Sequence, residues 1–220
     1  MKNLQECSDK TWGLKADFQF QTVERKPVVP RSIVLLLHGL DERGLRIYRK
    51  LINYLPADSY VIAPNAPFPM PRMKVDRFDL GYTWYFYDKF TDSYLVDQSL
   101  ALSLMRDLLT MANPQHLPVT LIGFSQGGYL APLLGFENSD VKKVIGIGCE
   151  FRSHFFNQVP DYELHAVHGA DDTIIPSAQA LREIESLKTK GTNVYWHLAQ
   201  GAKHEINASV GTIVKKILEI

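Results

Sequence analysis

The stretch Val119-Thr120-Leu121-Ile122-Gly123-Phe124-Ser125-Gln126-Gly127-Gly128 decides the fold of this chain. An apolar run with strand character leads directly into Gly-x-Ser-x-Gly, and residues compatible with a helix follow. This order predicts a sharp strand-to-helix turn that raises the serine hydroxyl above the edge of a sheet. Gly123 and Gly127 suit such a turn because strand and helix backbones pass too closely there for Cβ atoms. The motif alone arises by chance in roughly one chain in twenty, so a nucleophilic Ser125 needs partners elsewhere.

The rest of the chain alternates between strand-like and helix-like segments, which predicts an α/β fold with a mostly parallel sheet and helices on both faces. We expect strands at 33–37, 60–63, 119–122, 141–147, 164–167 and 193–198, and helices at 43–55, 93–112, after Ser125, at 177–189 and at 205–219. Residues 64–93 show no clear periodicity and are expected to form a long loop near the active site. Residues 1–30 form either an N-terminal extension or an edge strand, and a single domain over 1–220 accounts for the whole pattern.

Composition narrows the classes of protein. Lys and Arg number 24 against 24 Asp and Glu, and this balance argues against a nucleic-acid binder. Two widely separated cysteines form neither a disulfide framework nor a zinc site, which favours a reducing compartment. Residues 1–10 contain no apolar stretch of the kind found in a secretory signal, and no apolar run approaches the ~20 residues of a membrane span. We therefore expect a cytoplasmic protein without stable membrane insertion.

A serine nucleophile needs a general base that is itself oriented by an acid. In the strand-turn-helix setting these partners follow in the order Ser, acid, His. Asp171 and Asp172 lie on a loop after the strand predicted at 164–167, and His204 lies on a loop after the strand predicted at 193–198. An aspartate in such a loop often caps a helix or lies in a solvated turn, and this reading suits Asp171. We predict Ser125, Asp172 and His204 as the catalytic residues.

Hydrolysis also requires donors for the oxyanion of the tetrahedral intermediate. One donor is expected to be the backbone N–H of Gln126, and the other the N–H of Leu40, in the loop after the strand at 33–37. His38 either holds that loop in shape or is a histidine satisfied within the core. His165 and His168 do not suggest a metal pair, because residues three apart on a strand point to opposite faces. No metal and no other cofactor is expected.

At this level of detail the sequence resembles the phospholipase/carboxylesterase branch of the α/β-hydrolases, which includes acyl-protein thioesterases. The resemblance rests on strings in the family's order: Leu37-His38-Gly39-Leu40, Ala63-Pro64-Asn65-Ala66-Pro67, Gly123-Phe124-Ser125-Gln126-Gly127-Gly128, His168-Gly169 through Asp172 to Ile175-Pro176, and Gly201-Ala202-Lys203-His204-Glu205. By matching position, the family's nucleophile falls on Ser125, its acid on Asp172 rather than Asp171, and its base on His204. The resemblance implies the α/β-hydrolase fold and hydrolysis of carboxylic esters or thioesters.

Two segments depart from the family pattern. Asp41-Glu42-Arg43 stand where the family usually continues Gly-Asp and a small residue, which puts the conformation of the oxyanion loop in question. The run Tyr82-Thr83-Trp84-Tyr85-Phe86-Tyr87 carries extra aromatic residues before Asp88. Trp84, Tyr85 and Phe86 are candidates for an apolar wall that binds substrate, although aromatic side chains more often pack a loop onto the core.

The predicted substrate is a small-molecule ester or thioester, with an acylated protein or a lysolipid as further candidates. A monomer and a homodimer are equally compatible with the sequence. Two rival functions remain open at this stage. One is a serine peptidase or amidase on the same fold, and the other is a non-catalytic binding protein that kept the scaffold.

Overall fold

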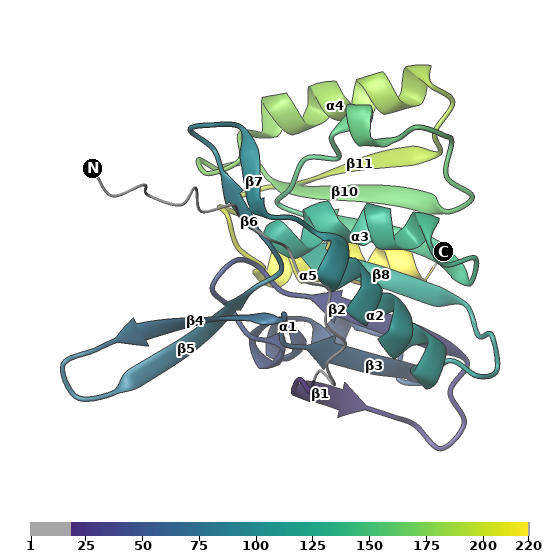
Figure 1. Ribbon diagram of the computed structural model, residues 1–220. Helices are drawn as coiled ribbons and strands as arrows, with labels where there is room; N and C mark the ends of the chain where they lie inside the picture. Colours follow the sequence, from purple (N-terminus) through teal and green to yellow (C-terminus); the bar gives the residue numbers. More distant parts are fainter. Residues whose placement is uncertain (1–18, 220) are drawn as a thin grey trace, which may run out of the picture.

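A seven-stranded sheet forms the centre of the computed structural model, which describes residues 19–219 (Figure 1). The strand order is β1-β3-β2-β8-β9-β10-β11, and every neighbouring pair is parallel except the antiparallel edge pair β1–β3. The strands are β1 (Thr22–Arg25), β2 (Ser32–Leu37), β3 (Ser59–Pro64), β8 (Val119–Phe124), β9 (Val141–Ile147), β10 (Glu163–Gly169) and β11 (Val194–Ala199). The α/β architecture expected from the alternation of segments is therefore confirmed.

Helices cover both faces of this sheet (Figure 1). They are α1 (Gly44–Leu51), α2 (Ser99–Ala112), α3 (Gln126–Phe136), α4 (Ser177–Thr189) and α5 (Ala208–Leu218), with short 3₁₀ turns at η1 (Ile52–Tyr54) and η2 (Ser153–Phe155). Side chains of β2 alternate between the two layers: Ile33 and Leu35 pack with α2, α3 and α4, whereas Val34 and Leu36 pack with α1 and α5. A strand buried on both faces needs an unbroken apolar run, which is what the sequence of β2 supplies.

Most elements lie where the sequence predicts them, and the segment 64–112 is the exception. It contains two antiparallel hairpins, β4 (Phe68–Met73) with β5 (Phe78–Thr83) and β6 (Phe86–Asp88) with β7 (Ser93–Val96). The expectation of an irregular loop over 64–93 is wrong in this respect. Pro69 and Pro71 conceal the first hairpin in the sequence, because proline normally argues against a strand and is tolerated only at a sheet edge.

The expected helix over 93–112 is also wrong at its beginning. Residues Ser93–Val96 form β7, and α2 begins only at Ser99. Two interactions explain the difference. Tyr94 packs against Tyr85 and Tyr87, with ring centroids 5.7 and 5.2 Å apart. Asp97 then accepts a hydrogen bond from the Ser99 amide at the start of the helix. Tertiary packing of Tyr94 thus outweighs helical periodicity.

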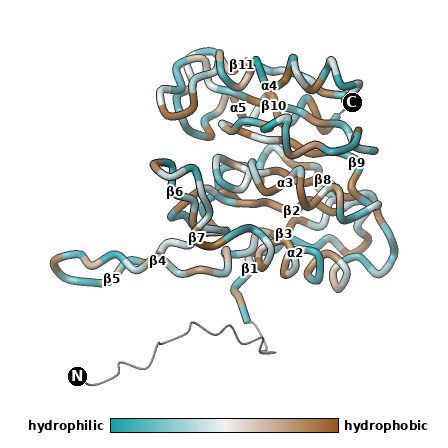
Figure 2. The backbone as a smooth tube through the Cα atoms, turned by 45° about the horizontal axis from the view of Figure 1, so that its top comes forward, coloured by the Kyte–Doolittle hydropathy of each residue, from teal (hydrophilic) through white to brown (hydrophobic). Residues whose placement is uncertain are grey.

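The hairpin β4–β5 extends away from the body of the molecule (Figure 1), and polar residues colour much of its outer part in Figure 2. β1 is an edge strand, as one of the two expectations for residues 1–30 required. Residues 1–18, with the predicted N-terminal extension and the stretch assessed for a signal, lie outside the described residues. No helix within residues 19–219 is long and apolar enough to cross a membrane.

The parallel register brings the carboxyl ends of five strands to one edge of the sheet. Leu37 pairs with Gly123, Phe124 with Ile147, and Gly169 with Ala199. The loops that follow β2, β8, β9, β10 and β11 therefore meet at this edge, which is where ligands bind in parallel α/β sheets.

Candidate active site

Ser125 occupies a strained turn between β8 and α3. Its backbone angles are φ 49° and ψ −117°, a conformation that non-glycine residues rarely adopt. A Cβ atom on Gly123 would lie 2.2 Å from the Gly127 carbonyl oxygen, and one on Gly127 would lie 2.2 Å from that of Leu37. The two glycines are therefore required by close backbone approach, as the sequence predicted. Such strain, worth about 1–3 kcal/mol, is typical of residues that a fold holds in position for function.

The three residues predicted as catalytic lie within hydrogen-bonding distance of one another. His204 Nε2 is 3.0 Å from Ser125 Oγ, and His204 Nδ1 is 2.8 Å from Asp172 Oδ2. The Asp172 side chain is fully buried, whereas that of His204 is 18% exposed. The ring of Phe124 packs against the imidazole at a centroid distance of 5.1 Å. The arrangement can move a proton from the serine hydroxyl to an imidazole that a carboxylate orients.

Backbone hydrogen bonds fix the acid and the base relative to each other. The amides of Ile174 and Ile175 both donate to Asp172 Oδ1 at 2.9 Å, which leaves Oδ2 directed at the imidazole. The Asp171 amide donates to the Ala202 carbonyl at 2.9 Å and so joins the acid loop to the histidine loop. The Asp171 side chain is exposed and makes no ion pair with a described residue. Asp172, rather than Asp171, therefore contacts His204.

His168 also contacts the loop that carries Asp172. Its Nε2 lies 2.7 Å from the Ile175 carbonyl and 3.6 Å from Asp172 Oδ2, and its ring stacks on Trp196. His165 instead pairs with His197 at 3.1 Å, on the other face of the sheet. The two histidines point to opposite faces, as their spacing predicted. Within residues 19–219, no group of three or more His, Cys, Asp or Glu side chains could hold a metal ion.

The loop after β2 is held by the fully buried His38. Its Nε2 accepts a hydrogen bond from the Ala66 amide at 3.0 Å, and its Nδ1 donates to the Gly39 carbonyl at 2.7 Å. Acceptance by Nε2 requires the neutral ring, and burial lowers the pKa of His38 from 6.5 to about 4. His38 is thus satisfied within the core and holds the loop in shape at the same time.

Asp41, Glu42 and Arg43 make contacts that join this loop to the hairpin β4–β5. The Asp41 amide donates to the Tyr82 carbonyl, and the Tyr82 amide donates to the Glu42 carbonyl, both at 2.9 Å. Asp41 adopts a left-handed conformation, φ 58°, that allows this pairing.

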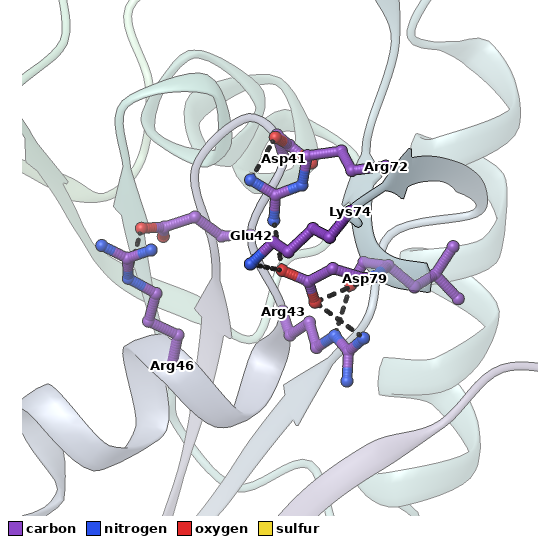
Figure 3. Close-up of polar contacts among 8 residues, drawn as sticks. Asp41, Glu42, Arg43, Arg46, Arg72, Lys74 and Asp79 are labelled. Carbon is purple, nitrogen blue, oxygen red and sulfur yellow. Dashed lines mark hydrogen bonds and ion pairs between the residues drawn. The ribbon is translucent and has the colours of Figure 1, made fainter. Parts of the chain in front are cut away.

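The side chains of Asp41, Glu42 and Arg43 each form an ion pair with a nearby residue of opposite charge (Figure 3). Arg72 lies 3.0 Å from Asp41, Arg46 lies 2.9 Å from Glu42, and Arg43 lies 3.7 Å from Asp79. Asp41, Glu42 and Arg43 are thus each paired with a charge of opposite sign from another residue. The amides of Leu40 and Gln126 make no hydrogen bond with any of residues 19–219, so both can donate to an oxyanion.

The aromatic candidates for substrate binding differ in exposure. Trp84 is fully buried and donates through Nε1 to the His38 carbonyl at 2.8 Å, and Tyr85 is 7% exposed. Only Phe86 is partly exposed, where it packs against Phe68. Trp84 and Tyr85 thus pack against the loop after β2 and the core, and a role in substrate binding stays a prediction for all three residues.

The Gln126 side chain has a role that sequence reasoning missed. Its Oε1 accepts a hydrogen bond from the Trp84 amide at 3.0 Å, and its Nε2 donates to the Tyr85 carbonyl at 2.9 Å. The residue after the nucleophile therefore holds the aromatic segment with its side chain. The string Gly-Phe-Ser-Gln-Gly-Gly, which is more specific than Gly-x-Ser-x-Gly, contained this signal.

Comparison with known proteins identifies the family. The model of the phospholipase/carboxylesterase family matches residues 19–220. The chain belongs to this family. No curated protein matches the chain.

Solved structures resemble this member of the phospholipase/carboxylesterase family along nearly its entire length. Acyl-protein thioesterase 2 from Zea mays superposes with a TM-score of 0.71 at 18% identity, covering 92% of this chain and 98% of the other. The esterase PE8 gives 0.69 at 21%, covering 91% and 98%, and a carboxylesterase from Mesorhizobium loti gives 0.69 at 19%, covering 94% and 98%. At such identities the likeness shows the fold, and the chain has the α/β-hydrolase fold.

Proposed function

We propose that this protein is a serine hydrolase that cleaves carboxylic esters or thioesters through an acyl-serine intermediate. The observation that carries the proposal is the continuous set of contacts from Asp172 through His204 to Ser125 Oγ, with distances of 2.8 and 3.0 Å. Membership of the phospholipase/carboxylesterase family supports the same reaction class.

In the proposed mechanism, His204 Nε2 removes the proton from Ser125 as Oγ attacks the acyl carbonyl carbon. The carbonyl π electrons move to the oxygen, and the tetrahedral intermediate then expels the alcohol or thiol, which takes the proton from His204. Water attacks the acyl-serine in the same way and releases the acid. The Asp172 carboxylate accepts a hydrogen bond from Nδ1–H of His204 and so keeps the imidazole in the required orientation.

We assign the stabilisation of the oxyanion to hydrogen bonds from the backbone amides of Leu40 and Gln126. Gln126 begins α3, so its N–H is one of the helix donors that lack an intrahelical acceptor. The N-terminus of a helix also favours a negative charge. Preorganised donors of this kind are worth ~10²–10³ in rate in a measured case.

Several finer statements belong to the same proposal. The substrate is a small-molecule ester or thioester, with an acylated protein and a lysolipid as the larger candidates. The proposed mechanism requires no cofactor, and the protein neither binds nucleic acid nor inserts stably into a membrane. A single domain contains all of the proposed catalytic residues. Cys149, a buried free thiol, agrees with a cytoplasmic location, where thiols stay reduced. The protein acts as a monomer or a homodimer.

Replacement of the nucleophile tests the proposal. Ser125→Ala should lower kcat on 4-nitrophenyl esters by about 10⁴–10⁶-fold, while the melting temperature stays within a few degrees of the wild type. A fluorophosphonate should label the wild type at Ser125 and leave the variant unlabelled. Hydrolysis by the variant at the wild-type rate would exclude Ser125 as nucleophile.

The same assays separate the two rival functions. A peptidase or amidase would hydrolyse an anilide about as readily as the matching phenyl ester, whereas an esterase would strongly prefer the ester. A non-catalytic binding protein would fold normally and fail to react with the fluorophosphonate.

A further inference from the structure

The strongest unexplained feature near Ser125 is Arg152, at the end of the loop that follows β9. Its guanidinium carbon lies 5.1 Å from the ring centre of Tyr87 and 5.4 Å from that of Tyr129. Tyr94 packs beside Tyr87 and completes the aromatic surroundings. We call Arg152, Tyr87, Tyr94 and Tyr129 the arginine–tyrosine cluster. It joins the hairpin β6–β7, helix α3 and the β9 loop, so residues distant in sequence build it together.

The β9 loop connects this cluster directly to the proposed catalytic base. A Cβ atom on Gly148 would lie 3.3 Å from His204 Nδ1, so the loop begins against the imidazole. Arg152 follows four residues later, and an extended chain of four residues spans at most about 14 Å. Tyr129 lies one helical turn after the nucleophile, and its amide donates to the Ser125 carbonyl at 3.3 Å. The cluster therefore lies beside the candidate active site.

The Arg152 side chain is half-buried and forms no salt bridge with a described residue, but it is hydrogen-bonded to the Tyr87 hydroxyl. Charged groups nearby do not neutralise it by direct contact. The Glu150 carboxyl interacts with it electrostatically but forms no salt bridge with it. Asp92 is held instead by the Tyr87 hydroxyl, with which it forms a hydrogen bond. Burial lowers the pKa of Arg152, but the hydrogen bond with Tyr87 and the neighbouring tyrosines outweigh it and raise the pKa above its usual value, so the guanidinium stays charged.

Arginine offers five N–H donors in a planar fork that matches the two oxygens of a carboxylate or phosphate. The rings of Tyr87 and Tyr129 lie against the guanidinium, and the Tyr87 hydroxyl occupies part of this fork, so a carboxylate or phosphate would bind to the donors that remain. We propose that Arg152 binds an anionic group of the substrate, a carboxylate or a phosphate, so that the site prefers esters or thioesters that carry negative charge. This inference rests on the proposed function, because it names the substrate class of the same site.

A purely structural role makes a different prediction. If Arg152 only held the hairpin β6–β7 on the body through its contacts with Tyr87 and Tyr129, its loss would affect neutral and anionic substrates equally. The two roles are therefore separated by the charge of the substrate, not by activity as such.

The experiment compares mono-4-nitrophenyl adipate, whose free end is a carboxylate, with its methyl ester, which has the same acyl chain and no charge. Arg152→Met should lower kcat/KM for the anionic ester by roughly 10–100-fold, the range expected for a charge-assisted hydrogen bond, and change the neutral ester less than about threefold. Arg152→Lys keeps the charge without the fork and should lose part of this effect. An equal loss on both esters, or no preference for the anionic ester in the wild type, would exclude an anion on the acyl side of the substrate.

Lys89→Met provides a matched control. Like Arg152, Lys89 lies over an aromatic ring, that of Phe90 at 5.3 Å. It belongs to the turn between β6 and β7, and its contact with Phe90 is exposed to solvent. This variant should treat both esters as the wild type does. A second substrate pair, 4-acetoxybenzoate and its methyl ester, carries the charge on the leaving group. Dependence on Arg152 in one of the two pairs identifies the side of the substrate that bears the anion, and dependence in neither overturns the inference.

Calorimetry gives a readout that does not require catalysis. Adipate and inorganic phosphate are titrated into the wild type, Arg152→Met and Lys89→Met. Binding that is present in the wild type and Lys89→Met but lost in Arg152→Met supports the anion site, and the anion that binds identifies its chemistry. Absence of binding in the wild type counts against the site. A wild type that binds adipate but hydrolyses neither ester and resists the fluorophosphonate contradicts the proposed function alone.

Discussion

The Ser125 turn and the Leu40–Arg43 loop lie side by side at one edge of the sheet, but different forces hold them. The turn is constrained by backbones that leave no room for a Cβ on Gly123 or Gly127. The loop is held by a buried histidine, by two backbone hydrogen bonds to Tyr82 and by partly exposed ion pairs. Close backbone packing tolerates almost no substitution, whereas a network of polar contacts can be built from many residue types. This contrast explains why the chain keeps the family string at Ser125 and departs from it at Asp41-Glu42-Arg43.

The largest loss of activity should come from replacing Asp172, the acid that orients His204 beside the Ser125 turn. Asp172→Asn retains the shape of the side chain but presents an amide to Nδ1, which favours the wrong imidazole tautomer. We expect kcat for 4-nitrophenyl acetate to fall by about 10⁴-fold, as for the corresponding change in a serine protease. Asp171→Asn, the matched control, should retain activity within about threefold. Similar losses in both variants would contradict the assignment of the acid.

A smaller effect on folding stability should come from His38, which lies between the Ser125 turn and the Leu40–Arg43 loop. Its imidazole is neutral in the folded protein. Its pKa is about 4 in the folded protein and about 6.5 when unfolded. As pH falls from 6.5 to 4, the unfolded chain takes up a proton first, so folding stability decreases. Above pH 6.5 the group has no effect. One such histidine accounts for about 3 kcal/mol of lost stability by pH 4.

Urea unfolding at pH 7.5 and pH 4.5 measures this contribution. His38→Gln should lose less stability between the two pH values than the wild type does. His165→Gln is the control, because burial also lowers the pKa of His165 to about 4, while the residue lies near the opposite end of its strand. Both variants should reduce the acid sensitivity, but only His38→Gln should lower kcat. A wild-type pH dependence in His38→Gln would exclude the residue as its source.

The smallest effect should come from the ion pairs that join the loop to the hairpin β4–β5. Arg72 is 49% exposed and Asp41 is 28% exposed, so their pair is screened by solvent. Arg72→Gln should reduce the free energy of unfolding by less than about 1 kcal/mol and kcat/KM by less than threefold. The difference from wild type should shrink in 0.5 M NaCl. Arg106→Gln on α2 serves as a control for removing an exposed arginine, and a tenfold loss of activity only in Arg72→Gln would show that the hairpin shapes the oxyanion loop.

The sequence predicted the central sheet well because strands buried on both faces leave unbroken apolar runs, as at 33–37 and 144–147. It was misleading at 64–96, where two prolines conceal one hairpin and Tyr94 gains its strand conformation from Tyr85 and Tyr87. These contacts arise only when the two hairpins pack on the body. The buried positions of Trp84 and Tyr85 were unpredictable for the same reason.

The sequence by itself determined the order of Ser125, Asp172 and His204 along the chain and the ends of the strands that carry them, because glycine spacing and apolar periodicity are local properties. Only the tertiary structure brought Oγ, the imidazole and the carboxylate within hydrogen-bonding distance, and only it chose Asp172 over Asp171 by geometry. It also decided the contacts of His38, the Gln126 side chain and Arg152. Each of these residues depends on partners from distant segments, and the energy of a polar contact is fixed by burial and distance, neither of which a linear sequence records.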